Sequence, residues 1–214
     1  MAIAYRNGTT AGNASGGNLT INTPTGTVDN DILVVCLYRE GGTWTLPDGW
    51  TLIRDEARGT TLWTTLAWKR ASSEGASYTF NLSSSVWRTA AMAAFSGCLT
   101  SGDVIDVSTG TNGLGYPTAA SVTTTADAHM EVAGFATYEG NNLSAGTGTA
   151  LTQGPFKGGC EIWYAVKTTA GATGSTALSP NTQTYASVTA ALKIAAAVTF
   201  QPRPAAAIDS LMVC

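Results

Sequence analysis

The chain contains an internal repeat at a spacing of 98 residues. When the 214-residue sequence is shifted by 98 positions against itself, its hydrophobic pattern realigns without gaps. For example, residues 32–35 (Ile-Leu-Val-Val) fall on residues 130–133 (Met-Glu-Val-Ala). Few positions are identical, so the spacing of apolar residues carries the match. The repeat predicts two copies of one β-rich unit, at about residues 1–98 and 99–196.

The two copies can be arranged in two ways. Each unit is long enough to be a small domain, but duplicated β units also form the two halves of one sandwich. No linker rich in charge or proline lies near residues 97–103. We therefore expect a single domain over residues 1–196.

Strand-like segments follow one another at short spacings and predict an all-β fold. Residues 32–38 form a long apolar run, typical of a strand that is buried on both faces. Residues 60–70 alternate between two faces, and the Pro-Asp-Gly of residues 47–49 predicts a tight turn. With no amphipathic helix between the strands, the pattern indicates a jelly-roll-like antiparallel β-sandwich.

One segment gives conflicting signals. Residues 86–96 are rich in alanine, which favours a helix. Their counterpart in the second copy, residues 185–194, has more β-branched residues. We therefore expect both segments to be strands.

The last residues, 197–214, fall outside the repeat and predict an extended C-terminal arm. Two prolines one residue apart favour an extended backbone, and the segment then becomes apolar again. The arm either folds back on its own sandwich or docks on a neighbouring subunit, and we favour the second. The candidate partner-contact residues are Phe200, Pro202, Pro204, Ile208, Leu211, Met212 and Val213.

Charge is scarce in this sequence. Charged residues make up 12% of the chain, against roughly 25% in typical domains. A surface of hydroxyls and small side chains suits close packing against a partner. The net charge is −3, and the eleven Lys and Arg are scattered, so we expect no nucleic-acid binding.

Cysteine spacing and hydropathy restrict the class of protein further. The four cysteines show none of the short spacings of a zinc site. One disulfide or four free thiols both fit, and free thiols are favoured. The sequence opens without the pattern of a signal peptide, and no apolar run reaches the roughly 18 residues that span a bilayer. We expect synthesis in a cytoplasm and no membrane contact.

Catalytic and metal-binding patterns are weak. His129 is the only histidine, and it has no G-x-S-x-G motif that would mark a hydrolase, so we expect a strand-edge histidine. Asp29 and Asp31 resemble a calcium cluster but are more typical of turn caps. The same holds for Asp103, Asp106 and Asp127. No pair of glutamates is marked as a glycosidase pair. We predict no catalytic residue, no cofactor and no metal, and hence no enzyme.

Six tryptophans leave two interpretations open. They either fill the core or stack on sugar rings. Core packing is favoured for most of them, whereas Trp44 and Trp87 lack an apolar face and are the best candidates for exposure.

Several short motifs resemble those of a known group. They are Asp31-Ile32-Leu33-Val34-Val35, Pro47-Asp48-Gly49-Trp50, Trp68-Lys69, Glu74-Gly75-Ala76-Ser77-Tyr78-Thr79-Phe80 and Phe95-Ser96-Gly97. Together they are similar to β-sandwich structural proteins of tailed phages and prophages, over residues 20–195 or so. The chain has Asn30 where that group has Gly, and Trp68 where it has Tyr.

The resemblance implies a virion protein. Our first prediction is a capsid decoration, or cement, subunit that binds the major capsid protein and its own copies, most simply as a homotrimer. Its C-terminal arm, and the Gly-rich N-terminus with it, would lie along neighbouring subunits and stabilise the phage head. The alternative is a tail-tip or fibre module that binds a host-surface glycan. A polysaccharide hydrolase or lyase is the third hypothesis.

Overall fold

The computed structural model describes residues 2–13, 16–138, 143–144, 152–157, 159–178 and 182–195. All regular elements in these ranges are β-strands, which confirms the predicted all-β class. The strands are β1 (Ala4–Asn13), β2 (Asn18–Asn22), β3 (Ile32–Arg39), β4 (Trp44–Thr45), β5 (Thr51–Arg58), β6 (Leu62–Arg70), β7 (Ser77–Leu82), β8 (Arg88–Ser96), β9 (Ile105–Gly115), β10 (Thr118–Ala119), β11 (Thr123–Thr124), β12 (His129–Thr137), β13 (Thr152–Lys157), β14 (Cys160–Lys167), β15 (Gly171–Ala172), β16 (Thr176–Ala177) and β17 (Gln183–Leu192).

The first half of the chain forms a jelly roll. Its large sheet has the order β1-β8-β3-β6-β5, and a smaller sheet has the order β2-β7-β4. All of these neighbours pair antiparallel. The Ala-rich segment is strand β8, because it lies between β1 and β3 and its small side chains fit between two packed layers. Here tertiary packing overrides the helical propensity of alanine.

The second half repeats the strand order of the first. Its large sheet runs β9-β17-β12-β14-β13, so β12 holds the place of β3 and β17 that of β8. The ladders also show where a uniform shift of 98 fails. Val34 pairs with Trp68, and its counterpart Val132 pairs with Tyr164, so the second sheet has two fewer residues between these strands. The outer layer is also reduced, to the two-stranded pairs β10-β16 and β11-β15.

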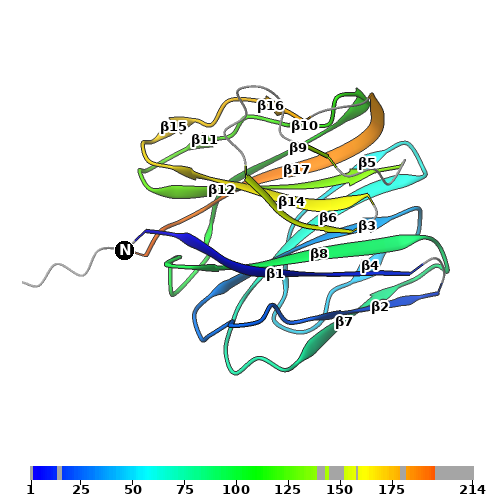
Figure 1. The fold of residues 1–214 in the computed structure, drawn as a ribbon, viewed down its shortest axis with the longest axis horizontal. Helices are drawn as coiled ribbons and strands as arrows, with labels where there is room; N and C mark the ends of the chain where they lie inside the picture. The colour runs from blue at the N-terminus through cyan, green and yellow to red at the C-terminus, as the bar shows by residue number, and fades with distance from the viewer. Residues whose placement is uncertain are drawn as a thin grey trace, which may run out of the picture.

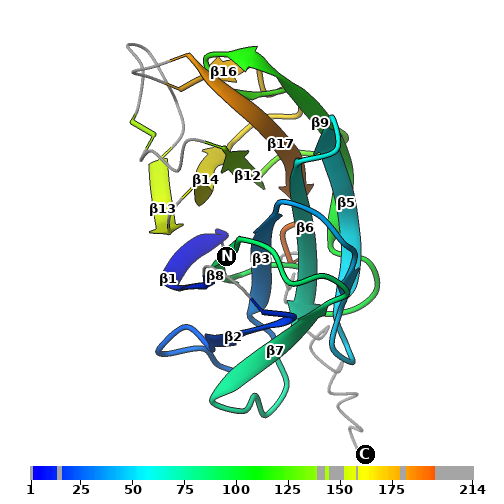
Figure 2. The ribbon, with the colours of Figure 1, turned by 90° about the vertical axis from the view of Figure 1, so that its right-hand side faces the viewer.

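The two large sheets face each other at the centre of the molecule, and the small sheets lie outside them (Figures 1 and 2). One hydrophobic core lies between the large sheets, and a separate core lies beneath each outer layer. Strand β3 therefore packs against apolar side chains on both faces and is buried throughout. This confirms the prediction for residues 32–38.

At the centre, corresponding positions of the two sheets touch. Cys36 of β3 corresponds to Gly134 of β12 along the chain, and a Cβ built on Gly134 would lie 2.9 Å from the Cys36 sulfur. The Cys36 thiol donates to the carbonyl of Phe135, and the Cys160 thiol donates to the carbonyl of Cys36. Cys36 contributes a side chain to this close contact, whereas Gly134 has none.

The edges of the two sheets meet on both sides of the sandwich. Strand β5 packs against β9, and β1 packs against β13 (Figure 2). Asn112 donates from its side-chain amide to Glu56 at 2.8 Å, which ties β9 to β5. Because β9 and β1 hold the same place in their sheets, as do β5 and β13, the two contacts are related by an approximate two-fold axis.

The start of the chain and the end of the last described segment lie at one end of the sandwich. The amide of Ala195 donates to the carbonyl of Gly97, and Cys98 forms a bridge with Ile194. A Cβ on Gly97 would in turn collide with the carbonyl of Ala2. Figure 1 shows both segments at the left-hand end. Residues 196–214, and with them the predicted arm, lie outside the described residues.

Candidate functional site

Three of the short motifs, at residues 47–50, 68–69 and 74–80, converge in space. The predicted turn forms, with the amide of Trp50 donating to the carbonyl of Pro47 and Gly49 at a φ of 82°. The Trp50 ring then packs edge-to-face on Tyr78 and Phe80, at centroid distances of 5.1 and 5.3 Å. Residues far apart in the sequence thus build one aromatic wedge beneath the outer sheet.

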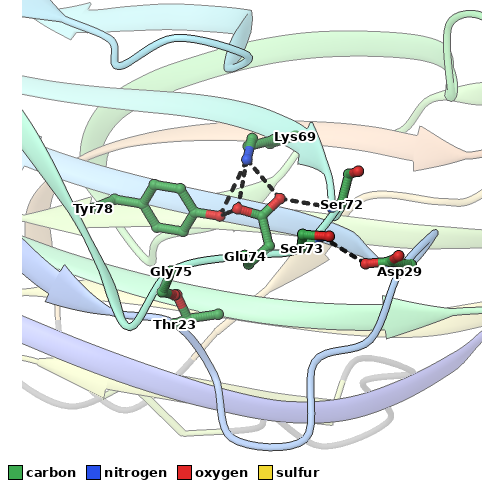
Figure 3. Close-up of polar contacts among 8 residues, drawn as sticks. All are labelled: Thr23, Asp29, Lys69, Ser72, Ser73, Glu74, Gly75 and Tyr78. Carbon is green, nitrogen blue, oxygen red and sulfur yellow. Dashed lines mark hydrogen bonds and ion pairs between the residues drawn. The ribbon is translucent and has the colours of Figure 1, made fainter.

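Beside this wedge, Lys69, Glu74 and Tyr78 form a compact polar group (Figure 3). The Lys69 ammonium lies 2.5 Å from both carboxylate oxygens of Glu74, and the Tyr78 hydroxyl donates to the same carboxylate. Burial opposes the charge on Glu74. The hydrogen bonds from Lys69, Tyr78 and the Ser72 amide outweigh that effect and lower the pKa of Glu74. The three side chains satisfy one another, which is the arrangement of a structural cluster.

Asp29 and Asp31 act as turn caps. The amide of Ser73 donates to Asp29 at 2.7 Å, which holds the Glu74 loop against the turn before β3 (Figure 3). Asp31 accepts from the Val28 amide and pairs with Arg6 at 2.7 Å. In this structure both carboxylates have protein partners, in line with the turn-cap interpretation.

His129 lies in a pocket of about 200 Å³ at the end of β12. Its Nε2 is 3.2 Å from Asp106, which also accepts from the amide and hydroxyl of Thr125. Burial acts to raise the pKa of Asp106, but these hydrogen bonds and the nearby His129 and Lys193 lower it overall. The Thr125 hydroxyl donates to Asp106 and not to His129, so the arrangement lacks the nucleophile–base contact of a hydrolase. The residues lining this pocket are Leu99, Asp106, Thr125, Ala126, His129, Lys193 and Ile194.

A second pocket, of about 190 Å³, opens beside Arg39. The Arg39 guanidinium is 3% exposed and binds both carboxylate oxygens of Asp55, at 2.8 and 2.6 Å. It also donates to the Thr65 hydroxyl. Trp44 lines this pocket and is only 8% exposed, so the expectation that it is exposed was wrong: Trp44 lies in the outer strand β4, and its ring packs into the core beneath the outer sheet. Trp87 is 43% exposed, as expected.

Two buried glutamates lie on β12 and β14 and have different surroundings. Glu161 accepts from the Leu143 amide and the Trp163 indole, whereas Glu131 has one carboxylate oxygen without a hydrogen-bond partner. Burial raises the pKa of both. Glu161 is part of the packing of the second outer core, beside Trp163.

The described cysteines are free, as predicted, and all of them are buried. They are Cys36, Cys98 and Cys160. Burial raises the pKa of Cys98 to about 12 and also raises the pKa of Cys36 well above its usual value, so neither thiol ionises readily.

Comparison with known proteins adds no family to this geometry. No protein-family model, curated protein or solved structure matches the chain. Within the described residues, no group of three or more His, Cys, Asp or Glu is placed to hold a metal ion. The same part of the chain holds no helix that is both long and apolar enough to cross a membrane.

The predicted partner-contact residues all lie outside the described residues: Phe200, Pro202, Pro204, Ile208, Leu211, Met212 and Val213. Sequence reasoning identified Lys69, Glu74 and Tyr78 only as parts of motifs and missed that they meet. It also missed the Arg39–Asp55 pair, for which a charge directly after an apolar strand run was the available signal.

Proposed function

We propose that this protein is a structural virion protein, a decoration subunit that stabilises a phage head through contacts between subunits. In this proposal it binds the major capsid protein and further copies of itself, and it acts without catalysis or a cofactor. The alternative glycan-binding function is taken up separately below.

The observation that carries this proposal is the convergence of three of the resemblance motifs in one packed cluster. The turn at Trp50, the Lys69–Glu74 pair and Tyr78 all serve to fasten an outer sheet to a central one. The resemblance to phage β-sandwich proteins therefore rests on residues that build a scaffold. Such motifs are those expected of a module whose function is contact.

The position of the chain ends supports a tethered arrangement. Ala195 lies beside Gly97 and the start of β1, so the predicted arm leaves the sandwich from the same end as the N-terminus. Two segments from one end can reach neighbouring subunits and leave the opposite end free. Apolar contacts of this kind contribute roughly 25 cal/mol per Å² before ordering costs are subtracted.

The test is binding to undecorated phage heads, measured by co-sedimentation. We expect the full chain to bind at saturating occupancy and a variant lacking residues 199–214 to lose binding while its circular dichroism stays native. A second variant keeps the length of the arm but replaces Ile208, Leu211, Met212 and Val213 with Ser, and it should lose binding too. Full occupancy of both variants would refute the role of the arm. Failure of the full chain to bind would refute the proposed function.

A further inference from the structure

At the end opposite the chain termini, the inner faces of the two central sheets extend past the central core, and we call the side chains there, Glu40, Trp87, Leu114 and Tyr138, the mouth. On β3, the side chains of Cys36 and Tyr38 point into the space between the sheets. A backbone hydrogen bond from the Glu40 amide to the Trp87 carbonyl extends the β3–β8 ladder by one residue beyond the Arg39–Arg88 pair. By alternation, Glu40 and Trp87 lie on the same inner face, beyond the core.

The facing sheet presents matching residues at the same level. The amide of Tyr138 donates to the carbonyl of Thr184, and Thr184 pairs with Leu114 on β9. The next inner position of β17 is Ala186, which belongs to the central core. Tyr138 and Leu114 therefore continue the inner face of the second sheet past the end of the core. Because β9 packs against β5 and β8 packs against β13 and β14, Leu114 lies toward the other edge of the sandwich from Trp87.

These side chains are exposed, and a carboxylate lies among them. Trp87, Tyr138 and Leu114 are 43%, 55% and 68% exposed. The Tyr38 hydroxyl, which is buried, donates to Glu40 at 3.0 Å and fixes the direction of that carboxylate. Burial, this hydrogen bond and the nearby Tyr138 phenol raise the pKa of Tyr38, so it remains a donor to Glu40 at neutral pH.

We propose that this mouth binds a neutral oligosaccharide, with pyranose rings stacked on Trp87 and Tyr138 and sugar hydroxyls donating to Glu40. Aromatic rings offer apolar faces to the C–H faces of sugars, and a few fixed polar groups give orientation. A carboxylate held by Tyr38 still has lone pairs to accept from hydroxyl donors. The mouth thus combines the two kinds of contact that a sugar ring requires.

Charge selects the class of glycan. Glu40 is the acidic residue of the mouth, and the whole chain has a net charge of −3. Like charges at a binding surface disfavour a partner. We therefore expect neutral glycans to bind and sialylated or phosphorylated ones to be rejected.

This proposal is independent of the capsid-binding function. The start of the chain and Ala195 lie at the opposite end of the sandwich, where residues 31 and 129 begin the central strands. A chain attached by that end would present Trp87 and Tyr138 outward. A decoration subunit can then carry a particle to a glycan-coated surface without using the contacts that hold it on the head.

The experiment is a titration with cellotriose, chitotriose, lactose and sialyllactose, monitored by tryptophan fluorescence and by calorimetry. We expect at least one neutral sugar to bind and sialyllactose not to bind. Trp87→Ala and Tyr138→Ala should each weaken binding about tenfold. Leu52→Ala is the matched control, because Leu52 is 51% exposed but lies at the Arg39 pocket on another face, and this variant should bind like wild type.

Three results would overturn the proposal. The first is no binding of any neutral sugar, and the second is equal binding by wild type, Trp87→Ala and Tyr138→Ala. The third is a change in sedimentation coefficient on Trp87→Ala with no sugar effect, which would make the mouth an interface between copies of the chain. Binding of Trp87→Ala to phage heads, measured separately, should equal that of wild type. A failure of the sugar-binding proposal is therefore distinguishable from a failure of the capsid proposal.

Discussion

Replacing Gly134 with Ala tests the packing of the two central sheets directly. A Cβ at this position would lie 2.8 Å from Cδ1 of Leu66 and 2.9 Å from the sulfur of Cys36. Normal contacts between carbon atoms are about 3.5–4.0 Å, so the new methyl group overlaps both neighbours. Leu66 and Cys36 are fully buried and cannot move into solvent.

Overpacking of this kind costs about 1–3 kcal/mol. The loss of backbone freedom in the unfolded chain offsets about 0.4–1 kcal/mol of that cost, so we expect Gly134→Ala to lower the free energy of unfolding by about 1–2 kcal/mol. Urea denaturation at an unchanged m-value measures it. Gly75→Ala is the control, since no atom lies within 4 Å of a Cβ at that position, and it should be neutral or stabilising.

A double-mutant cycle then isolates the contact. Cys36→Ala removes the sulfur atom that meets the new methyl group, so Gly134→Ala should cost less in the Cys36→Ala background than in wild type. The coupling expected for residues in contact is about 0.5–3 kcal/mol. A Gly134→Ala variant as stable as Gly75→Ala, or strict additivity with Cys36→Ala, would refute the face-to-face arrangement of β3 and β12.

Three further predictions concern ionisable groups. Glu74→Gln should lower the free energy of unfolding by about 1.5–3 kcal/mol, because charged hydrogen bonds to Lys69 and Tyr78 are lost, and a neutral result in urea denaturation would count against it. Because the pKa of Glu131 is raised in the folded state, protonation of its carboxyl stabilises the fold. This stabilisation is complete below the unfolded pKa of about 4.3 and is lost as the pH rises through the higher folded pKa. The free energy of unfolding of Glu131→Gln relative to wild type should therefore increase as the pH rises from 4 to 7. A difference between the two proteins that stays constant across that range would exclude this. Cys36 should react with iodoacetamide only as fast as the protein unfolds, and rapid labelling by mass spectrometry under native conditions would contradict its burial.

Local patterns in the sequence predicted the strands well where one interaction dominates. The continuous apolar run of β3 has both faces buried because it lies between two cores, and the Pro-Asp-Gly turn before Trp50 forms from its own backbone preferences. Strand β8 needed information beyond its own alanines, and comparison with the second copy supplied it. These features depend on neighbours in sequence or on periodicity.

Contacts between distant segments were not predictable in the same way. Glu131 lies on the face of β12 that points away from the central core. It is buried at 5% exposure, because the reduced outer layer covers that face too. Trp44 in the first unit lies in the outer sheet itself and is buried because its ring packs on the central sheet. The contact of Cys36 with Gly134 requires the two sheets to face each other, which no local pattern encodes. Burial of an element's second face depends on what packs over it.

The stabilisation of phage heads tests the central claim most directly. The measurement is the temperature at which filled heads release DNA to an intercalating dye, with and without saturating amounts of this protein. The proposed function predicts a higher release temperature when the protein is present and no change when the variant lacking residues 199–214 replaces it. Heads that bind the protein but release DNA at an unchanged temperature would contradict a decoration subunit that holds its neighbours together.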